Sequence, residues 1–280
     1  MKRLKPIITL FFGCLALFFT GWCQAEETKP YTVFVVPQFT PVELHKAWTP
    51  ILDKLSQATG FQFELKIFPT IPEFEHAVFT GEADFVFMNP YHQVVAKRTQ
   101  GYIPLVRDEK SLEGILLVKK DSPIKMLSEL NDQKIAFPAP NAFAASLYMR
   151  ALLAHQGINI VPDYVKNHSN VYRAIVLGDV VAGGGVNNTL QRELESVQKQ
   201  LKVFYTTPKF APHPFSAHPR ITEAVRNQIA SSFLQLAADP ANAALLNAIQ
   251  IPKPIAADYV RDYLPLEALD LDSFFVKENP

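Results

Sequence analysis

Polar and aromatic side chains able to bind a small ligand follow several apolar segments of the chain. Gln38 and Phe39 come after the first of these segments, and Tyr91 and His168 come after later ones. Asn187 stands close to the start of a further predicted helix. Amide, phenol and imidazole groups donate and accept hydrogen bonds, so they are candidates for a ligand-binding site. Each position also has a structural interpretation, as a packed aromatic ring, a structural histidine or a helix cap.

A second candidate is the run Asn-Ala-Phe-Ala-Ala-Ser at residues 141–146, which opens a helix predicted over residues 142–156. Backbone N–H groups at a helix start bind anions without needing a particular side chain. Ala142, Phe143 and Ser146 are therefore candidate ligand-binding residues, and close packing of a small-residue helix on a sheet is the alternative. The three glycines at 183–185 lack the Lys and Ser/Thr that complete a phosphate loop, so a close approach of backbones is the better interpretation.

Catalytic and metal-binding motifs are incomplete in this sequence. Ser122 and Lys125 fit the Ser-x-x-Lys pattern of penicillin-binding enzymes, but the Ser-Asp-Asn and Lys-Thr-Gly partners are missing. His213 and His218 are close in sequence, but Pro214 lies between them and no third metal ligand is evident. We therefore expect no catalytic residues, no metal and no cofactor, and a protein that is not an enzyme.

The composition is that of a globular protein. The chain has 280 residues, of which 48% are hydrophobic, with 27 basic and 27 acidic side chains. Disordered chains have fewer apolar residues. The balanced charge and the lack of a basic run argue against a nucleic-acid partner. At roughly 150 residues per domain, the length suggests about two units.

Residues 1–25 have the plan of a secretory signal peptide. Basic residues at positions 2, 3 and 5 precede an apolar stretch over residues 7–22, which Cys23-Gln24-Ala25 ends. We expect cleavage after Ala25 and export to the periplasm. One alternative is a retained anchor, although the stretch is shorter than the about 20 residues of a membrane span. Another is lipid modification of Cys23, although Trp22 stands where such signals carry a small residue.

Removal of this segment changes the chemistry available to the mature chain. The segment holds three basic and no acidic residues, which leaves 27 − 3 = 24 basic against 27 acidic residues. Both cysteines, Cys14 and Cys23, also lie in it. The mature protein is therefore predicted to be mildly acidic and to have no thiol for a disulfide, a metal or nucleophilic attack.

Alternating strand and helix patterns position the candidate residues. Strands are predicted at residues 32–36, 61–67, 84–88, 103–106, 114–119, 134–137, 164–167, 180–186 and 202–205. Helices are predicted from about residues 40, 72, 90 and 142, and over residues 171–177 and 189–199, followed by a proline-rich loop and a helical tail led by residues 221–237. Short βα units predict an α/β fold with parallel sheets, in which ligands bind beyond the carboxyl ends of the strands.

Several short motifs occur in a characteristic order along the chain. With them, the chain resembles the periplasmic solute-binding proteins of phosphate, phosphite and phosphonate ABC transporters, a branch of the type II periplasmic binding proteins, over about residues 31–220. The motifs are Val36-Pro37-Gln38-Phe39-Thr40-Pro41, Trp48-Thr49-Pro50, Gly81-Glu82-Ala83-Asp84, Asn89-Pro90-Tyr91, Asp121-Ser122-Pro123, Pro140-Asn141, His168-Ser169 and Val186-Asn187-Asn188-Thr189.

The resemblance implies a two-lobed α/β fold with parallel-rich sheets and a ligand cleft between the lobes. Lobe 1 would comprise residues 26–115 and 207–280, and lobe 2 residues 116–206, with crossover strands near residues 114–119 and 202–205. The helical tail would return to lobe 1. The implied function is capture of a small polar or anionic ligand by lobe closure and delivery to an ABC permease, by a monomer. The alternative is a sensor that reports to a membrane histidine kinase or receptor.

One motif departs from the family pattern. Members that hold phosphorus oxyanions carry a Ser-Thr-Ser-Gly-like run after Pro-Asn, whereas this chain has Ala142, Phe143, Ala144 and Ala145 there, and only Ser146 keeps a hydroxyl. An oxyanion taken from water needs nearly all its oxygens bonded. We therefore expect phosphate and simple phosphonates to bind weakly, and a ligand with less charge and more apolar surface to bind better.

Overall fold

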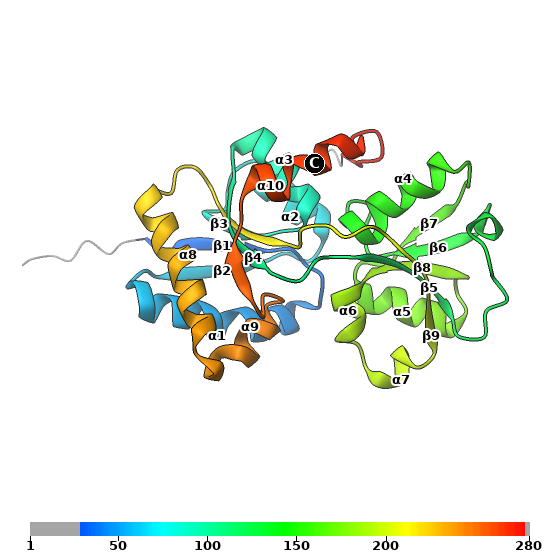
Figure 1. The fold of residues 1–280 in the computed structure, drawn as a ribbon, viewed down its shortest axis with the longest axis horizontal. Coiled ribbons are helices and arrows are strands. Elements are labelled where there is room, and N and C mark those ends of the chain that lie inside the picture. Colours follow the sequence, from blue (N-terminus) through cyan, green and yellow to red (C-terminus); the bar gives the residue numbers. More distant parts are fainter. Residues whose placement is uncertain (1–28, 278–280) are drawn as a thin grey trace, which may run out of the picture.

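The computed structural model describes residues 29–277, which form two α/β lobes lying side by side (Figure 1). The predicted signal peptide lies outside the described residues. Lobe 1 contains strands from both ends of the chain, and lobe 2 is formed by its middle part. Among the described residues, no helix is both long and apolar enough to cross a membrane.

Lobe 1 is built on a six-stranded sheet in the order β11-β4-β10-β3-β1-β2. β1 pairs in parallel with β2 and β3, whereas the strand pairs that involve β10 and β11 are antiparallel. The strands are β1 (Tyr31–Val35), β2 (Phe63–Ile67), β3 (Phe85–Phe87), β4 (Ile103–Asp108), β10 (Pro214–Ala217) and β11 (Pro254–Ala256).

Lobe 2 is built on a five-stranded sheet in the order β7-β6-β8-β5-β9. β6 pairs in parallel with β7 and β8, and β5 is antiparallel to β8 and β9. Both sheets are therefore mixed, and the parallel arrangement expected from the βα units holds only within those units. The strands are β5 (Gly114–Lys119), β6 (Lys134–Phe137), β7 (Val161–Tyr164), β8 (Ala182–Val186) and β9 (Leu201–Thr206).

Helices cover both faces of each sheet (Figure 1). In lobe 1, α1 packs with α8 and α9 on one side, and α2 packs with α3 on the other. The lobe 1 helices are α1 (Pro41–Thr59), α2 (Ile71–Phe79), α3 (Pro90–Gln100), α8 (Glu223–Ala238), α9 (Ala243–Ala248) and α10 (Tyr259–Asp262). Lobe 2 has a π-helical turn (Phe143–Leu147) that continues into α4 (Tyr148–His155), and then α5 (His168–Leu177), α6 (Asn187–Gln191) and α7 (Glu195–Gln198).

Helix α1 begins and ends where its sequence predicts. Thr40 accepts the backbone N–H of Glu43, whose carboxylate accepts the N–H of Thr40 at 3.0 Å, which completes the capping box. Pro41 occupies the first helical position, where no N–H donor is needed. Gly60 ends the helix with a φ of 78°, a left-handed conformation that favours glycine.

Two predicted elements are wrong, and the strand predicted over residues 164–167 is β7, three residues earlier. The proline-rich stretch after residue 208 contains β10, which begins with Pro214 at a position where a missing N–H is tolerated. The tail is mainly helical as predicted, and it also contains β11. The helix predicted over residues 189–199 is two short helices, because Leu194 is extended and the Glu193 carboxylate accepts its N–H at 3.1 Å.

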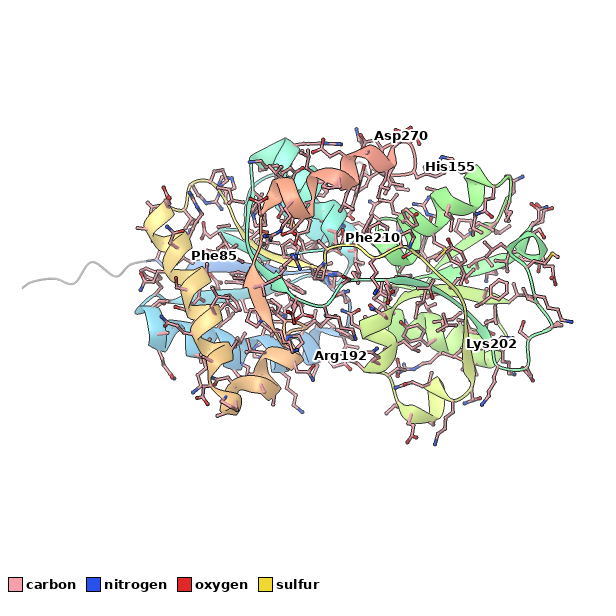
Figure 2. All side chains as sticks on the ribbon, viewed as in Figure 1. Phe85, His155, Arg192, Lys202, Phe210 and Asp270 are labelled. Atoms are coloured by element: carbon pink, nitrogen blue, oxygen red, sulfur yellow. The ribbon has the colours of Figure 1, made fainter. Side chains whose placement is uncertain are left out.

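The chain crosses between the lobes at residues 109–113 and 207–213, outside the two strands that were expected to cross. β5 and β9 both belong to the lobe 2 sheet. The two crossing segments form an isolated antiparallel bridge, with both Leu112 N to Phe210 O and Phe210 N to Leu112 O at 2.9 Å. Figure 2 shows Phe210 at the junction of the lobes.

The apolar core of lobe 1 continues into lobe 2. A single cluster of buried side chains joins Trp48, Phe87 and Phe215 of lobe 1 to Phe143 and Leu147 of the π-helical turn. The rest of lobe 2 has two separate cores, one on each face of its sheet. The π-helical turn therefore packs as part of both lobes.

Candidate ligand-binding site between the lobes

A small cavity, here called the inner cavity, lies between the lobes and has a volume of about 20 Å³. This volume is enough for about one water molecule. Its lining carries no Asp, Glu, Lys or Arg side chain. Lobe 1 contributes Val36, Gln38, Ile71 and Asn89, lobe 2 contributes Ala142–Ala145, His168 and Val186, and the crossing segments contribute Leu112 and His213.

Two buried histidines give the inner cavity its main hydrogen-bonding groups. His168 is 2% exposed at the start of α5, and its buried Nδ1 has no hydrogen-bond partner among residues 29–277. Burial lowers the pKa of His168 to about 4. His213 stacks on Phe87 with ring centroids 5.4 Å apart, and burial lowers its pKa to about 3, helped slightly by the two neighbouring histidines. Both imidazoles are therefore neutral at pH 7 and carry one donor and one acceptor each.

Gln38 follows β1 and lines the inner cavity, and a contact with a ligand stays a prediction. Its side chain is buried, and its Oε1 accepts a hydrogen bond from Gln250 Nε2 at 2.8 Å. This contact fixes the side chain from the lobe 1 side and leaves the Gln38 amide group as a further donor. The inner cavity thus combines neutral donors and acceptors from both lobes.

The π-helical turn closes the lobe 2 side of the cavity. The N–H of Leu147 bonds to Ala142 O at 3.2 Å, while among the described residues the N–H groups of Phe143, Ala144 and Ala145 have no acceptor. Ser146, which was expected at the site, does not line the cavity, and its Oγ accepts from Arg150 Nε at 3.4 Å. The free donors of this segment are therefore backbone groups, beside the ring of Phe143.

The glycines of β8 allow this turn to pack closely, as the sequence predicts. A Cβ atom on Gly184 would collide with the carbonyl oxygen of Ala145, and one on Gly185 would lie 2.6 Å from the hydroxyl of Tyr172. On β5, Gly114 faces the carbonyl of Ala144 in the same way. Gly184, like Gly114, therefore serves close backbone approach, which confirms the prediction for that glycine, whereas Gly185 makes room for the Tyr172 side chain of α5.

Tyr91 lies behind the inner cavity and does not line it. Its ring stacks on Phe143 with centroids 6.1 Å apart, and its hydroxyl donates to Asp272 Oδ1 at 2.7 Å. Burial and this hydrogen bond raise the pKa of Tyr91. A contact between Tyr91 and a ligand stays a prediction. In this structure Tyr91 packs against Phe143, and it is Phe143 that lines the cavity.

Asn187 and Phe39 lie outside the inner cavity. Asn187 holds the first crossing segment: its Oδ1 accepts from Glu113 N at 3.4 Å and its Nδ2 donates to Ser111 O at 3.3 Å. Phe39 lines a second, larger cavity together with residues of α1, α5 and the α6 end. That second space, here called the outer cavity, shares Val36 and Gln38 with the inner one.

A buried polar cluster, here called the latch, joins the lobes next to the inner cavity. It consists of Glu75, Asn89 and His92 of lobe 1, Asn141 of lobe 2 and the backbone of Val276. Asn141 Nδ2 donates to Glu75 Oε2 at 2.9 Å, and Asn89 Nδ2 donates to Asn141 O at 3.0 Å. His92 Nε2 lies 2.7 Å from Glu75 Oε1. The cluster joins α2, α3 and the loop that precedes the π-helical turn. Its side chains are buried, so their hydrogen bonds are strong and the loss of a partner is costly.

The C-terminal segment completes the latch and contacts both lobes. The side chain of Asn141 bonds to both backbone groups of Val276, at 2.8 and 2.9 Å. Arg150 of α4 donates to Phe274 O at 2.8 Å, and Arg98 of α3 pairs with Asp272 at 2.9 Å. The tail packs on lobe 1, and it also contacts lobe 2.

A family of known proteins matches almost the whole described chain. The model for the periplasmic phosphonate substrate-binding proteins of ABC transporters matches residues 33–263. The chain belongs to this family. A comparison with curated protein sequences gave no match.

Several solved structures have the same two-lobed fold. A binding protein of a phosphonate transporter from Pseudomonas aeruginosa gives a TM-score of 0.76 at 17% identity and covers 86% of each chain. PhnD1 from Prochlorococcus marinus, in complex with methylphosphonate, gives a TM-score of 0.77 at 16% identity, and the match covers 86% of this chain and 97% of PhnD1. A protein from Xanthomonas citri with bound chloride gives a TM-score of 0.73 at 16% identity, and the match covers 87% of this chain and 98% of that protein. Identities this low establish the fold of this family member and not its ligand.

Some residues that line the inner cavity were not among the candidates chosen from the sequence. His213 was considered only as half of a metal pair with His218, yet His218 packs edge-on against Tyr102 and no group of metal-binding residues is found among residues 29–277. Asn89 belongs to the Asn89-Pro90-Tyr91 motif, but its hydrogen bond to Asn141 forms only because the two lobes meet there. No signal along the chain marks His213, because its loop has no periodicity.

Proposed function

We propose that this protein is the exported solute-binding component of an ABC importer, which holds a small polar or anionic ligand between its lobes and delivers it to a permease. Family membership supports this, and so does a cavity lined from both lobes in which the buried Nδ1 of His168 lacks a partner. A buried polar atom without a partner costs about 1–3 kcal/mol, which a ligand hydrogen bond would recover. The protein would act in the periplasm after removal of residues 1–25.

We further propose that phosphate and simple phosphonates are poor ligands. The inner cavity has no cationic side chain, its two histidines are neutral at pH 7, and the family's hydroxyl run is replaced by Ala142, Phe143, Ala144 and Ala145. A desolvated dianion without a cation or hydroxyls to bind it would lose more free energy than the backbone N–H groups return.

A ligand panel scored by thermal unfolding tests the proposal. The panel consists of amino acids, carboxylates, sulfonates, phosphate and alkylphosphonates. A compound that binds should raise the free energy of unfolding by about 2.7 kcal/mol at a hundredfold excess over its Kd. His168→Phe, which keeps a ring but removes both nitrogens, should weaken binding by about 1–3 kcal/mol. His155→Phe, on the exposed face of α4, is the matched control.

Three observations would count against the proposal. If no member of a broad panel stabilises the protein, solute binding is contradicted. If His168→Phe binds as the original does, the ligand makes no hydrogen bond to His168. Micromolar binding of phosphate or methylphosphonate would contradict the ligand class.

Mass spectrometry of periplasmic material should give a mature chain that begins at Glu26, and neighbouring genes for a permease and an ATPase would support transport over sensing.

A further inference from the structure

The outer cavity is large enough for an organic molecule, whereas the inner one is not. Its volume is about 520 Å³, within the 300–1,000 Å³ typical of small-molecule sites. It lies between α1 of lobe 1 and the α5–α6 region of lobe 2, and its lining includes Phe39, Lys46, Trp48, Arg173, Arg192 and Leu194. Figure 2 shows Arg192 between the lobes, on the side away from the C-terminal segment.

The wall and the rim of the outer cavity differ in chemistry. Leu44, Trp48 and Phe87 are nearly inaccessible and form an apolar wall, beside the half-buried ring of Phe39. The rim is charged and exposed. A site with this division suits a molecule that has an apolar body and a charged end.

The charge of the rim favours an anion. Lys46, Arg173 and Arg192 line the cavity, and none of them has a carboxylate within 4 Å among the described residues. The lining also holds two carboxylates, so its net charge is 3 − 2 = +1. Both carboxylates accept hydrogen bonds from nearby N–H groups. Glu43 accepts from Thr40 N at 3.0 Å, and Glu193 accepts from Leu194 N at 3.1 Å.

Arg192 links the two lobes across this cavity. Its guanidinium lies 5.0 Å above the ring centroid of Phe39, and its Nη1 donates to Asn247 O at 2.8 Å. An aromatic ring and a guanidinium from opposite lobes therefore already form one stacked pair here. A planar group of a ligand could extend that stack without any change in the fold.

The two cavities adjoin along one path. Val36 and Gln38 line both of them, and the first turn of α5 gives His168 to the inner cavity and Ser169 to the outer one. A ligand in the outer cavity would therefore have the inner donors at one end. This arrangement suits an elongated solute better than a compact oxyanion.

We infer that the outer cavity is the main ligand site, and that its ligand is an organic anion with an aromatic or alkyl body whose charged group pairs with Arg173 and Lys46. This inference rests on the proposed solute-binding function and specifies its ligand class. Exposed cations attract anions most strongly at low ionic strength, so binding should weaken as salt is raised.

Calorimetry with phenylphosphonate and methylphosphonate tests the inference, because the two share a head group and differ in their apolar body. We expect phenylphosphonate to bind at least tenfold more tightly. The double variant Lys46→Gln/Arg173→Gln should weaken phenylphosphonate binding at least tenfold, and both side chains are exposed, so folding should be kept. Lys125→Gln, an exposed lysine on lobe 2 away from both cavities, is the matched control and should bind as the original does.

The outcomes separate the inference from the proposed function. If the double variant binds phenylphosphonate unchanged, or if methylphosphonate binds as tightly as phenylphosphonate, the outer cavity is not the site of an amphipathic anion. If neither phosphonate binds while a neutral or cationic solute closes the lobes, the inference is overturned and solute binding stands. If no solute of a broad panel binds, both are wrong.

Discussion

The lobes meet along two seams that differ in almost every physical property. On the latch side, Phe143 stacks on Tyr91 and lies edge-on to Phe210 at 5.0 Å, beside the buried Glu75–Asn141 hydrogen bond. On the outer-cavity side, the contacts are exposed or half-buried polar ones, such as Asn188 Nδ2 to Gln250 Oε1 at 2.7 Å. One seam is a continuation of the lobe 1 core, and the other is a wet, charged surface with space for a ligand.

This difference bears on the residues where the resemblance predicts a hydroxyl-rich, anion-binding run. Here Ala142, Phe143, Ala144 and Ala145 are buried in the apolar cluster that joins the lobes. The cations suited to an anion are on the opposite seam. If the outer cavity is the ligand site, as inferred above, packing and ligand recognition are divided between the two seams.

The largest expected effect comes from the packed seam. Phe143→Ala should lower the free energy of unfolding by about 3–5 kcal/mol, because it removes a fully buried ring and leaves a cavity. Phe39→Ala, the same change on the other seam, should cost less than about 1.5 kcal/mol because that ring is half-buried. Urea unfolding of both variants measures this, and equal losses would contradict the distinction between the seams.

The buried histidine of the inner cavity should make stability depend on pH. The pKa of His168 is about 4 in the folded state against 6.5 in the unfolded state, so the unfolded chain binds the proton first as the pH falls. Stability should therefore be constant above about pH 7 and decrease from pH 6.5 to 4, by roughly 3 kcal/mol for this group. His168→Gln should make this decrease shallower, and the part that comes from His213, whose pKa burial also lowers, should remain. An unchanged curve in His168→Gln would show that the histidine protonates without cost.

The latch gives an intermediate effect. Asn141→Ala should cost about 1–3 kcal/mol, because Glu75 and the backbone of Val276 lose buried partners. It should also shift the lobes toward more open arrangements, seen as a larger radius of gyration in X-ray scattering. A stable variant with unchanged scattering would mean that the aromatic stack alone holds this seam.

The smallest effect is expected at the exposed seam. Asn188→Ala removes one interlobe hydrogen bond to Gln250 and should cost no more than about 1 kcal/mol, since water replaces the lost partner. The comparison with Asn141→Ala is matched, because both changes delete an asparagine amide that joins the lobes. If Asn188→Ala lowered the free energy of unfolding more than Asn141→Ala does, the outer-cavity seam would contribute more to stability than the latch side, contrary to this prediction.

The sequence predicted the local elements better than the meeting of the lobes. The capping box of Thr40 and Glu43 and the apolar spacing that includes Trp48 identify α1 because both signals lie within one helix. Gln38 and His168 both line the inner cavity, and they were chosen as candidates because residues that follow strands meet at one edge of a sheet. His213 and the partner of Tyr91 were missed, because the Pro214 strand and the Asp272 contact depend on segments far apart in sequence.

The C-terminal segment determines how the lobes can move relative to each other. The bridge between Leu112 and Phe210 is one fixed point, and the contact of Val276 with Asn141 is a second. Two fixed points define an axis, so rotation about the line that joins them is the motion that keeps both intact. Arg192, which lines the outer cavity, lies on the side of the lobes away from the C-terminal segment (Figure 2), so the outer cavity would widen in such a rotation. The protein would open as a jaw, with the tail of the chain as one of its two pivots.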